Sequence, residues 1–144
     1  MHKTFCASGF LFHLPSQQIL LQQHLPSPSY HGSSWFLFGG KHTEKDQPEE
    51  IFQKIVEDLL DIKVSAVQPI YSYVHEETGE NHVIVYAKLK KMQNFPAKKG
   101  VQFAWFSFRD VLKLQVDEQT KHDIVVGQRV IEAAGRKSRG EHTL

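Results

Sequence analysis

The 144-residue chain has one cysteine, Cys6, and almost no charge imbalance, with 17 basic and 16 acidic residues and a formal net charge of +1. A single cysteine excludes an internal disulfide and favours a reducing, cytoplasmic setting. We expect Cys6 to be a small buried residue of the first strand rather than a nucleophile. The balanced charge creates no overall field for nucleic acid or a membrane surface, so we expect neither as a partner.

Long hydrophobic runs are also absent. No apolar stretch approaches the ~18 residues of a membrane span, and the N-terminal residues lack the continuous apolar stretch of a signal peptide. The sequence contains no internal repeat and no long low-complexity tract. With 40% hydrophobic residues, the chain can bury one core. These features predict a single domain over residues 1–135 and a disordered polar tail over 136–144.

Much of the sequence consists of segments that predict β-strands. Residues 4–12 and 19–21 are apolar segments separated by a Leu-Pro-Ser turn, which predicts a hairpin. Residues 64–74 and 82–90 flank an acidic turn and predict a second antiparallel hairpin. Residues 101–108 predict a further strand, followed by a short helical turn.

A helix is predicted over residues 48–60. Pro48 suits the first turn, where a missing N–H group costs nothing, and Glu49 and Glu50 complement the positive end of the helix dipole. Asp46, just before Gln47 and Pro48, is the expected N-cap.

A closing helix is predicted near the C-terminus. Thr120 and Asp123 have the spacing of a capping box, and Gly135 is the expected end of this helix. The order of strands and helices indicates an α+β fold with a mixed sheet packed between helices.

The segment from Gly40 to Ile62 follows the spacing of the Nudix box without a gap. That motif reads Gly, five residues, Glu, seven residues, then Arg-Glu-aliphatic-any-Glu-Glu-any-Gly-aliphatic. The chain matches it at Gly40, Val56 and Ile62, is similar at Asp46, Lys54 and Asp58, and departs from it at Ile55, Leu59 and Asp61. Residues 104–107, Ala-Trp-Phe-Ser, resemble a segment that follows in many Nudix proteins. On these residues the chain resembles the Nudix hydrolase superfamily.

The resemblance implies the Nudix fold and a nucleotide or nucleoside diphosphate ligand. Backbone amides of Gly39 and Gly40 and the ammonium of Lys41 would approach a diphosphate. Trp35, Phe36, Tyr71 or Tyr73 would stack a base. Asp58 is the best remaining box position for a metal-ligating carboxylate. Asp46 is a weaker, outer candidate, for which we favour the capping role. Asp58 with Glu57 would be catalytic if the protein is an active enzyme.

Helical spacing separates two apolar stripes in residues 48–60. With about 100° per residue, the first stripe contains Ile51, Ile55 and Leu59, and the second lies beside it. The second stripe, formed by Phe52, Val56 and Leu60, corresponds to the core-facing side of the family helix. The side that binds metal in the family is therefore aliphatic here.

Two classes of function follow. The first, which we favour, is a non-catalytic or very weakly active domain that binds a nucleotide or a protein. If the stripe of Ile51, Ile55 and Leu59 is exposed, it would be a contact surface, including one for a second copy; the alternative is that the chain's own loops cover it. The second is a Mg²⁺-dependent hydrolase of a nucleoside diphosphate linked to another moiety. It would use Asp58 with Glu57 or with acids outside the box, near Glu76.

The nine histidines are scattered along the chain. His75 and His82 flank the second hairpin turn and would face each other across it. A lone pair lacks the third and fourth ligands of a zinc site, so we do not expect one from these two residues alone.

Overall fold

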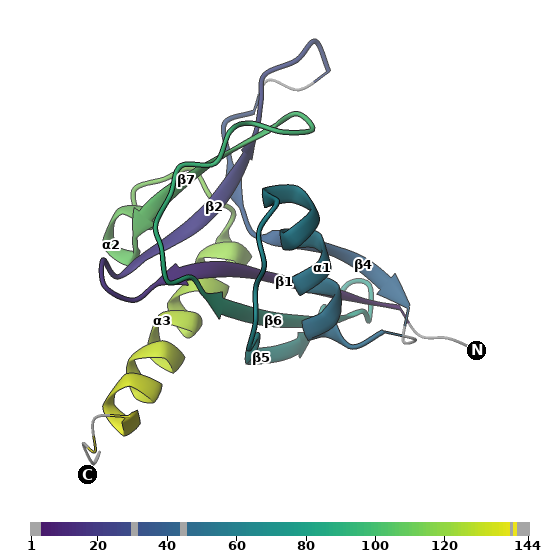
Figure 1. Ribbon diagram of the computed structural model, residues 1–144. Helices are drawn as coiled ribbons and strands as arrows, with labels where there is room; N and C mark the ends of the chain where they lie inside the picture. Colours follow the sequence, from purple (N-terminus) through teal and green to yellow (C-terminus); the bar gives the residue numbers. More distant parts are fainter. Residues whose placement is uncertain (1–3, 30–31, 44–45, 139, 141–144) are drawn as a thin grey trace.

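The computed structural model describes residues 4–29, 32–43, 46–138 and 140. Seven strands form one mixed sheet that lies between helices (Figure 1). The elements are Thr4–His13 (β1), Gln18–His24 (β2), Trp35–Phe36 (β3), Phe38–Thr43 (β4), Pro48–Leu60 (α1), Gln68–Val74 (β5), Asn81–Lys88 (β6), Val101–Ser107 (β7), Phe108–Val111 (α2) and Glu118–Ser138 (α3). No helix in the described ranges is both long and apolar enough to cross a membrane.

Strand β1 is the centre of the sheet. It pairs with β2 and β4 in antiparallel fashion and with β6 in parallel fashion. Strand β2 continues the sheet to β3 and β7, and β6 continues it to β5. Both predicted hairpins, β1–β2 and β5–β6, are confirmed, although β5 begins at Gln68 rather than at residue 64.

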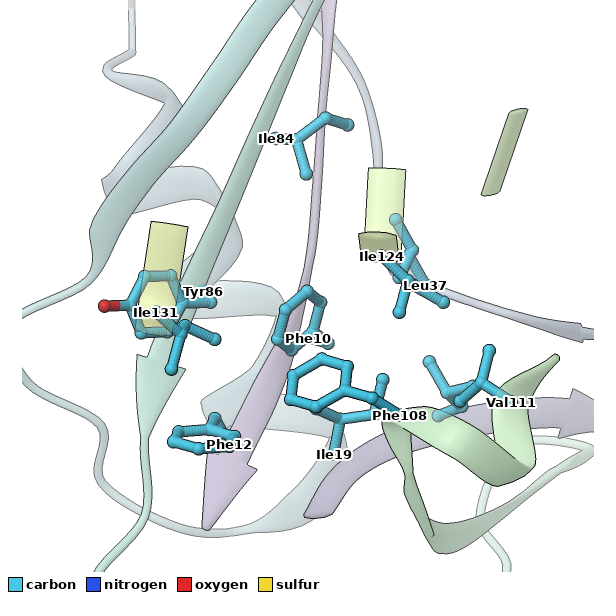
Figure 2. Close-up of a cluster of buried hydrophobic side chains, with 11 residues drawn as sticks. Phe10, Phe12, Ile19, Leu37, Ile84, Tyr86, Phe108, Val111, Ile124 and Ile131 are labelled. Atoms are coloured by element: carbon cyan, nitrogen blue, oxygen red, sulfur yellow. The ribbon is translucent and has the colours of Figure 1, made fainter. Parts of the chain in front are cut away.

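Alternate residues of β1 face two separate cores, because successive side chains of a strand point to opposite sides. Leu11 packs with Phe52 and Val56 of α1. Phe10 and Phe12 pack with residues of α3 and α2 on the other side. Figure 2 shows this second core, in which Phe10 lies close to Phe108 and the α3 residues Ile124 and Ile131 are also drawn. The helices α1 and α3 therefore cover opposite faces of the sheet (Figure 1).

Helix α1 spans the residues that the sequence predicts, but its cap is different. Gln47 is the N-cap and its side chain makes no capping hydrogen bond, so the expected cap at Asp46 is wrong. Leu60 is the last residue of the helix, and Asp61 is its C-cap. Asp61 adopts the left-handed conformation (φ 55°, ψ 48°), and its backbone N–H donates to the Glu57 carbonyl. This geometry explains why a glycine suits that position of the Nudix box, and Asp is among the few other residues that tolerate it.

Helix α3 begins and ends at residues other than those predicted. Asp117 is its cap, because its Oδ1 accepts from the backbone N–H of Thr120 at 2.8 Å. Thr120 is thus the third residue of the helix and not its cap. The helix passes through Gly135 to Ser138, since a glycine lowers helix stability by only about 1 kcal/mol. Residues 136–138 of the expected tail are therefore helical, and residues 139 and 141–144 lie outside the described residues.

Candidate functional site

A cavity of about 340 Å³ lies beside the first half of α1, at the position of the Nudix box. Its lining consists of Asp46, Glu50, Ile51, Lys54 and Ile55. Two of these five residues are aliphatic, and neither Glu57 nor Asp58 is among them.

The aliphatic stripe of α1 is covered in part by strand β1. Ile51 is only 5% exposed and packs with Phe5 and Ala7, and Ile55 packs against the same cluster. Leu59 is half-buried against the neighbouring core. The alternative in which all three side chains form an exposed stripe is therefore wrong for Ile51. Self-association through the remainder stays a prediction.

The two acids predicted to be catalytic occupy different environments. Glu57 Oε2 accepts from the backbone N–H of Val64 at 2.8 Å and from the Gln53 side-chain amide at 3.3 Å. The Val64 N–H is the main reason that the pKa of Glu57 is lowered. Glu57 thus holds the segment that follows α1 against the helix. Asp58 is exposed, and its backbone carbonyl accepts from Lys98 Nζ at 2.9 Å.

The donor set of α1 is a poor fit to a magnesium ion held by protein ligands. Mg²⁺ prefers hard oxygen ligands in octahedral geometry, and positions 55 and 59 offer none. Within the described ranges, α1 contributes to no group of three His, Cys, Asp or Glu side chains whose ligand atoms converge. Asp58 would hold such an ion only together with groups from a ligand or a loop.

Gly39, Gly40 and Lys41 lie on β4, paired with β1. A Cβ atom on Gly39 would lie 2.0 Å from the Ala7 carbonyl oxygen, so the close approach of the two strands requires glycine there. Lys41 Nζ lies 2.8 Å from Glu80 Oε2. Their contact with a substrate stays a prediction.

Trp35, the fourth predicted substrate contact, lies on a different element. It is on β3 and packs edge-on against Phe106, with ring centroids 4.9 Å apart. It contacts the core between the sheet and α3. The structure therefore places Trp35 in a packing role, and its role in substrate binding stays a prediction.

A second cavity, of about 400 Å³, lies on the α3 side of the sheet. Its lining is aromatic and acidic: Tyr71, Tyr73, Val74, His75, Glu76, Glu77, Gln119 and His122. The ring of Tyr71 lies 5.6 Å from that of Tyr73 and 6.0 Å from that of His122. The structure thus combines the tyrosines predicted to stack a base with the acids predicted outside the box.

Asp123 orients Tyr71 from beneath this second cavity. The Tyr71 hydroxyl donates to Asp123 Oδ1, and the Gln119 amide donates to the same oxygen at 2.9 Å. Asp123 is 4% exposed, and burial raises its pKa even though both hydrogen bonds oppose the shift. The sequence interpretation assigned Asp123 to a helix cap and missed this contact. No local signal reveals it, because Tyr71 is 52 residues away.

Comparison with solved structures identifies the fold. The chain matches a mutT/nudix family protein from Listeria innocua with a TM-score of 0.72 and 13% identity, over 90% of this chain and 94% of that one. It matches a C. elegans Ap4A hydrolase, solved as a binary complex, with a TM-score of 0.67 and 12% identity, over 89% and 98% of the two chains. It also matches the Nudix domain of Shewanella oneidensis NrtR, solved with ADP ribose, with a TM-score of 0.67 and 17% identity, over 90% and 88%.

These identities are low, so the matches show the fold alone. The expected α+β Nudix fold with a mixed sheet is thereby confirmed. No family model matches the sequence. No curated protein matches it either.

Proposed function

We propose that this Nudix-fold chain binds a nucleotide or nucleoside diphosphate derivative and hydrolyses it very weakly or not at all. The observation that carries the proposal is the packing of Ile55, which extends the buried cluster of Phe5, Ala7 and Ile51 at the position of a box glutamate. An aliphatic side chain in that cluster supplies no oxygen to a cation.

The chemistry of diphosphate cleavage explains why this matters. Metal-assisted hydrolysis requires a cation that neutralises the phosphates and activates a water molecule. A helix binds such a cation by placing carboxylates one turn apart on one face. Here Ile55 and Leu59 occupy two of the positions, and the carboxylate of Glu57 is already hydrogen-bonded to Val64 and Gln53. Of the box positions 55, 58 and 59, only position 58 still carries a carboxylate, that of Asp58.

The second cavity supports a binding role. Tyr71 and Tyr73 present aromatic rings of the kind on which a base stacks. The carboxylates of Glu76 and Glu77 provide acceptors for ribose hydroxyl groups. The ring of His82 stacks on Tyr73, and Glu80 lies between His82 and the ammonium of Lys41. This series of contacts joins the cavity to the predicted diphosphate contact at Lys41.

Calorimetry with ADP-ribose tests the binding role, because the NrtR domain with the same fold was solved with that ligand. We expect binding in the presence of EDTA, since the proposal needs no metal. Tyr73→Leu should weaken binding roughly 5-fold to 100-fold, the loss associated with one base stack. The matched control is Phe95→Leu, which removes an aromatic ring that packs against Phe103 in the other core. Equal loss in both variants would contradict the assignment of the cavity.

A hydrolysis assay tests the absence of catalysis. With Mg²⁺ and a panel of ADP-ribose, dinucleoside polyphosphates and oxidised nucleotides, we expect no turnover above the buffer rate. The double variant Ile55→Glu, Leu59→Glu should gain measurable Mg²⁺ affinity. Mg²⁺-dependent turnover that is lost in Asp58→Asn and kept in the control Asp110→Asn would instead establish the alternative, an active hydrolase with Mg²⁺ as its cofactor.

A further inference from the structure

Three side chains with metal-ligating atoms converge where β1 and β6 begin. Cys6 Sγ, a carboxylate oxygen of Glu80 and a ring nitrogen of His82 all lie within 4.8 Å of one another. Cys6 and His82 are paired in the parallel β1–β6 register, so their side chains share one face of the sheet. Glu80 precedes His82 by two residues, which brings its side chain to the same place. The face is the one opposite α1.

The distances are close to those around a tetrahedral metal ion. Cys6 Sγ lies 3.2 Å from Glu80 Oε1, and His82 Nε2 lies 3.8 Å from the same oxygen. Ligands bound to zinc at ordinary bond lengths are separated by about 3.3–3.5 Å. All three atoms already lie within 4.8 Å of one another, so side-chain movements of about 1 Å would place them on one ion.

The two oxygens of Glu80 have different neighbours. Oε2 accepts from Lys41 Nζ at 2.8 Å and from Thr4 Oγ1 at 3.4 Å, whereas Oε1 faces Cys6 and His82. An ion bound to Oε1 would leave the Lys41 ion pair intact. The Lys41 side chain is 64% exposed, so its ammonium can also move toward solvent. Lys41 thus orients the carboxylate without occupying the position of the ion.

The second ring nitrogen of His82 is also engaged. Tyr73 Oη lies 3.4 Å from His82 Nδ1, and the Tyr73 ring stacks on the imidazole with centroids 5.0 Å apart. Metal-binding histidines commonly use their other nitrogen in such a hydrogen bond, which fixes the tautomer and the ring orientation. With Nδ1 held by Tyr73, Nε2 is the nitrogen directed at Glu80.

We propose that Cys6, Glu80 and His82, none of which lies in the segment from Gly40 to Ile62, form a binding site for a zinc-class divalent ion. This proposal does not rest on the function proposed above. A thiolate, an imidazole and a carboxylate suit Zn²⁺ or Co²⁺ and not Mg²⁺, which prefers oxygen ligands alone. On binding, the Cys6 thiol releases its proton to solvent and a sulfur–metal bond forms, with no electron transfer. Three protein ligands leave a fourth position open to water or another ligand.

Cobalt titration of the full chain, without a histidine tag, tests the site. We expect one Co²⁺ per chain, with the thiolate-to-cobalt absorption band and the visible bands of tetrahedral Co²⁺, displaced by Zn²⁺ and unaffected by excess Mg²⁺. Cys6→Ser should abolish the thiolate band. Cys6→Ala and His82→Gln should each weaken Zn²⁺ binding at least ~100-fold, and Tyr73→Phe should weaken it roughly 10-fold. Zn²⁺ should also raise the melting temperature of the wild-type protein but not of Cys6→Ala.

Two control variants separate this site from nonspecific binding. His122→Gln and Glu77→Gln remove a histidine and a glutamate of the second cavity that lie outside the cluster, and both should bind Zn²⁺ as the wild type does. The proposal is overturned if saturating Co²⁺ gives no thiolate band in the folded wild type, or if His122→Gln weakens binding as much as His82→Gln. ADP-ribose binding measured in EDTA is independent of this result, so the two proposals fail separately.

Discussion

Gly9 and Phe10, two neighbouring residues of β1, contact helices on opposite faces of the sheet, and the two contacts are built differently. On one face, a Cβ atom on Gly9 would lie 2.1 Å from the Val85 carbonyl oxygen of β6 and 2.9 Å from Phe52 Cε2, so glycine leaves room for both β6 and the Phe52 ring of α1. On the other face, Phe10 projects toward Gly127 of α3, where a Cβ atom would lie 2.8 Å from Phe10 Cζ. In both contacts a phenylalanine faces a glycine. The strand supplies the glycine in the contact with α1 and the phenylalanine in the contact with α3. Close packing of this kind sets how near each helix lies to the sheet.

The same two faces also differ in their chemistry. The α1 face has aliphatic residues at positions where the Nudix box has carboxylates, namely Ile55 and Leu59. The α3 face carries the tyrosine cavity, the buried carboxylate of Asp123 and the cluster at Glu80. The tyrosine cavity and the cluster at Glu80 therefore lie on the side of the sheet opposite α1, whereas the cavity beside α1 combines Asp46, Glu50 and Lys54 with two isoleucines.

The largest expected effect comes from removing the ring that anchors α1. Phe52 is fully buried, and Phe52→Ala should lower the free energy of unfolding by about 3–5 kcal/mol because it leaves a cavity over Gly9. Urea denaturation measures this loss, with the exposed Lys54→Ala as the control on the same helix, for which the change should stay within about 0.5 kcal/mol. A loss of less than about 1 kcal/mol in Phe52→Ala would mean that α1 is not anchored there.

The matching substitution on the other face should have a smaller effect. Gly127→Ala adds a methyl group that would meet Phe10 at 2.8 Å and Ile70 Cδ1 at 3.0 Å. We expect a destabilisation of about 1–3 kcal/mol from overpacking, reduced by the higher helix propensity of alanine. Thermal unfolding measures it. Gly135→Ala, at a half-exposed position of the same helix, serves as the control and should show no loss. Higher stability of Gly127→Ala would contradict the close approach of α3.

Asp123 predicts a pH dependence that belongs to the α3 face. Its pKa is raised in the folded protein. Its contribution to the free energy of unfolding is therefore complete below the ordinary Asp pKa of about 3.9 and is lost as pH rises through the raised pKa. Asp123→Asn keeps an acceptor for Tyr71 and Gln119 but cannot titrate. Its stability should therefore improve relative to wild type as pH increases from 3 to 7. His122 and Asp117, the nearby charged groups, are the same in both proteins. A constant difference across urea titrations would refute the assignment.

The pH dependence expected from Glu57, on the α1 face, has the opposite sign to that of Asp123, and its effect is the smallest of the four. The pKa of Glu57 is lowered in the folded protein. Its contribution to stability is therefore present above about pH 4.3 and is lost as pH falls through the lowered pKa. Glu57→Gln should speed hydrogen exchange of the Val64 amide, which donates to this carboxylate, at pH 7 more than at pH 3. Glu50→Gln, exposed on the same helix, should leave that exchange rate unchanged. Equal exchange at Val64 in Glu57→Gln and wild type would show that the hydrogen bond does not protect the amide.

Much of the fold was predictable because its signals are local. The bounds of α1 follow from Pro48 and the apolar spacing after it, and both hairpins follow from apolar segments separated by turns. The caps were not predictable. Which residue becomes the N-cap depends on where the extended backbone turns into the helix. Gln47 occupies that place in α1 without a side-chain hydrogen bond, and Asp117 caps α3 by accepting from the Thr120 N–H, so Asp46 and Thr120 are not caps.

The sequence by itself determined the Nudix fold, the extent of α1 and the aliphatic character of the box positions at Ile55 and Leu59, because these depend on residue type and spacing along one segment. Only the tertiary structure decided that Tyr71 meets Asp123 and that Cys6 meets Glu80 and His82. Those residues are 52 to 76 positions apart, and strand pairing and helix packing, which no local pattern encodes, set the distances between them.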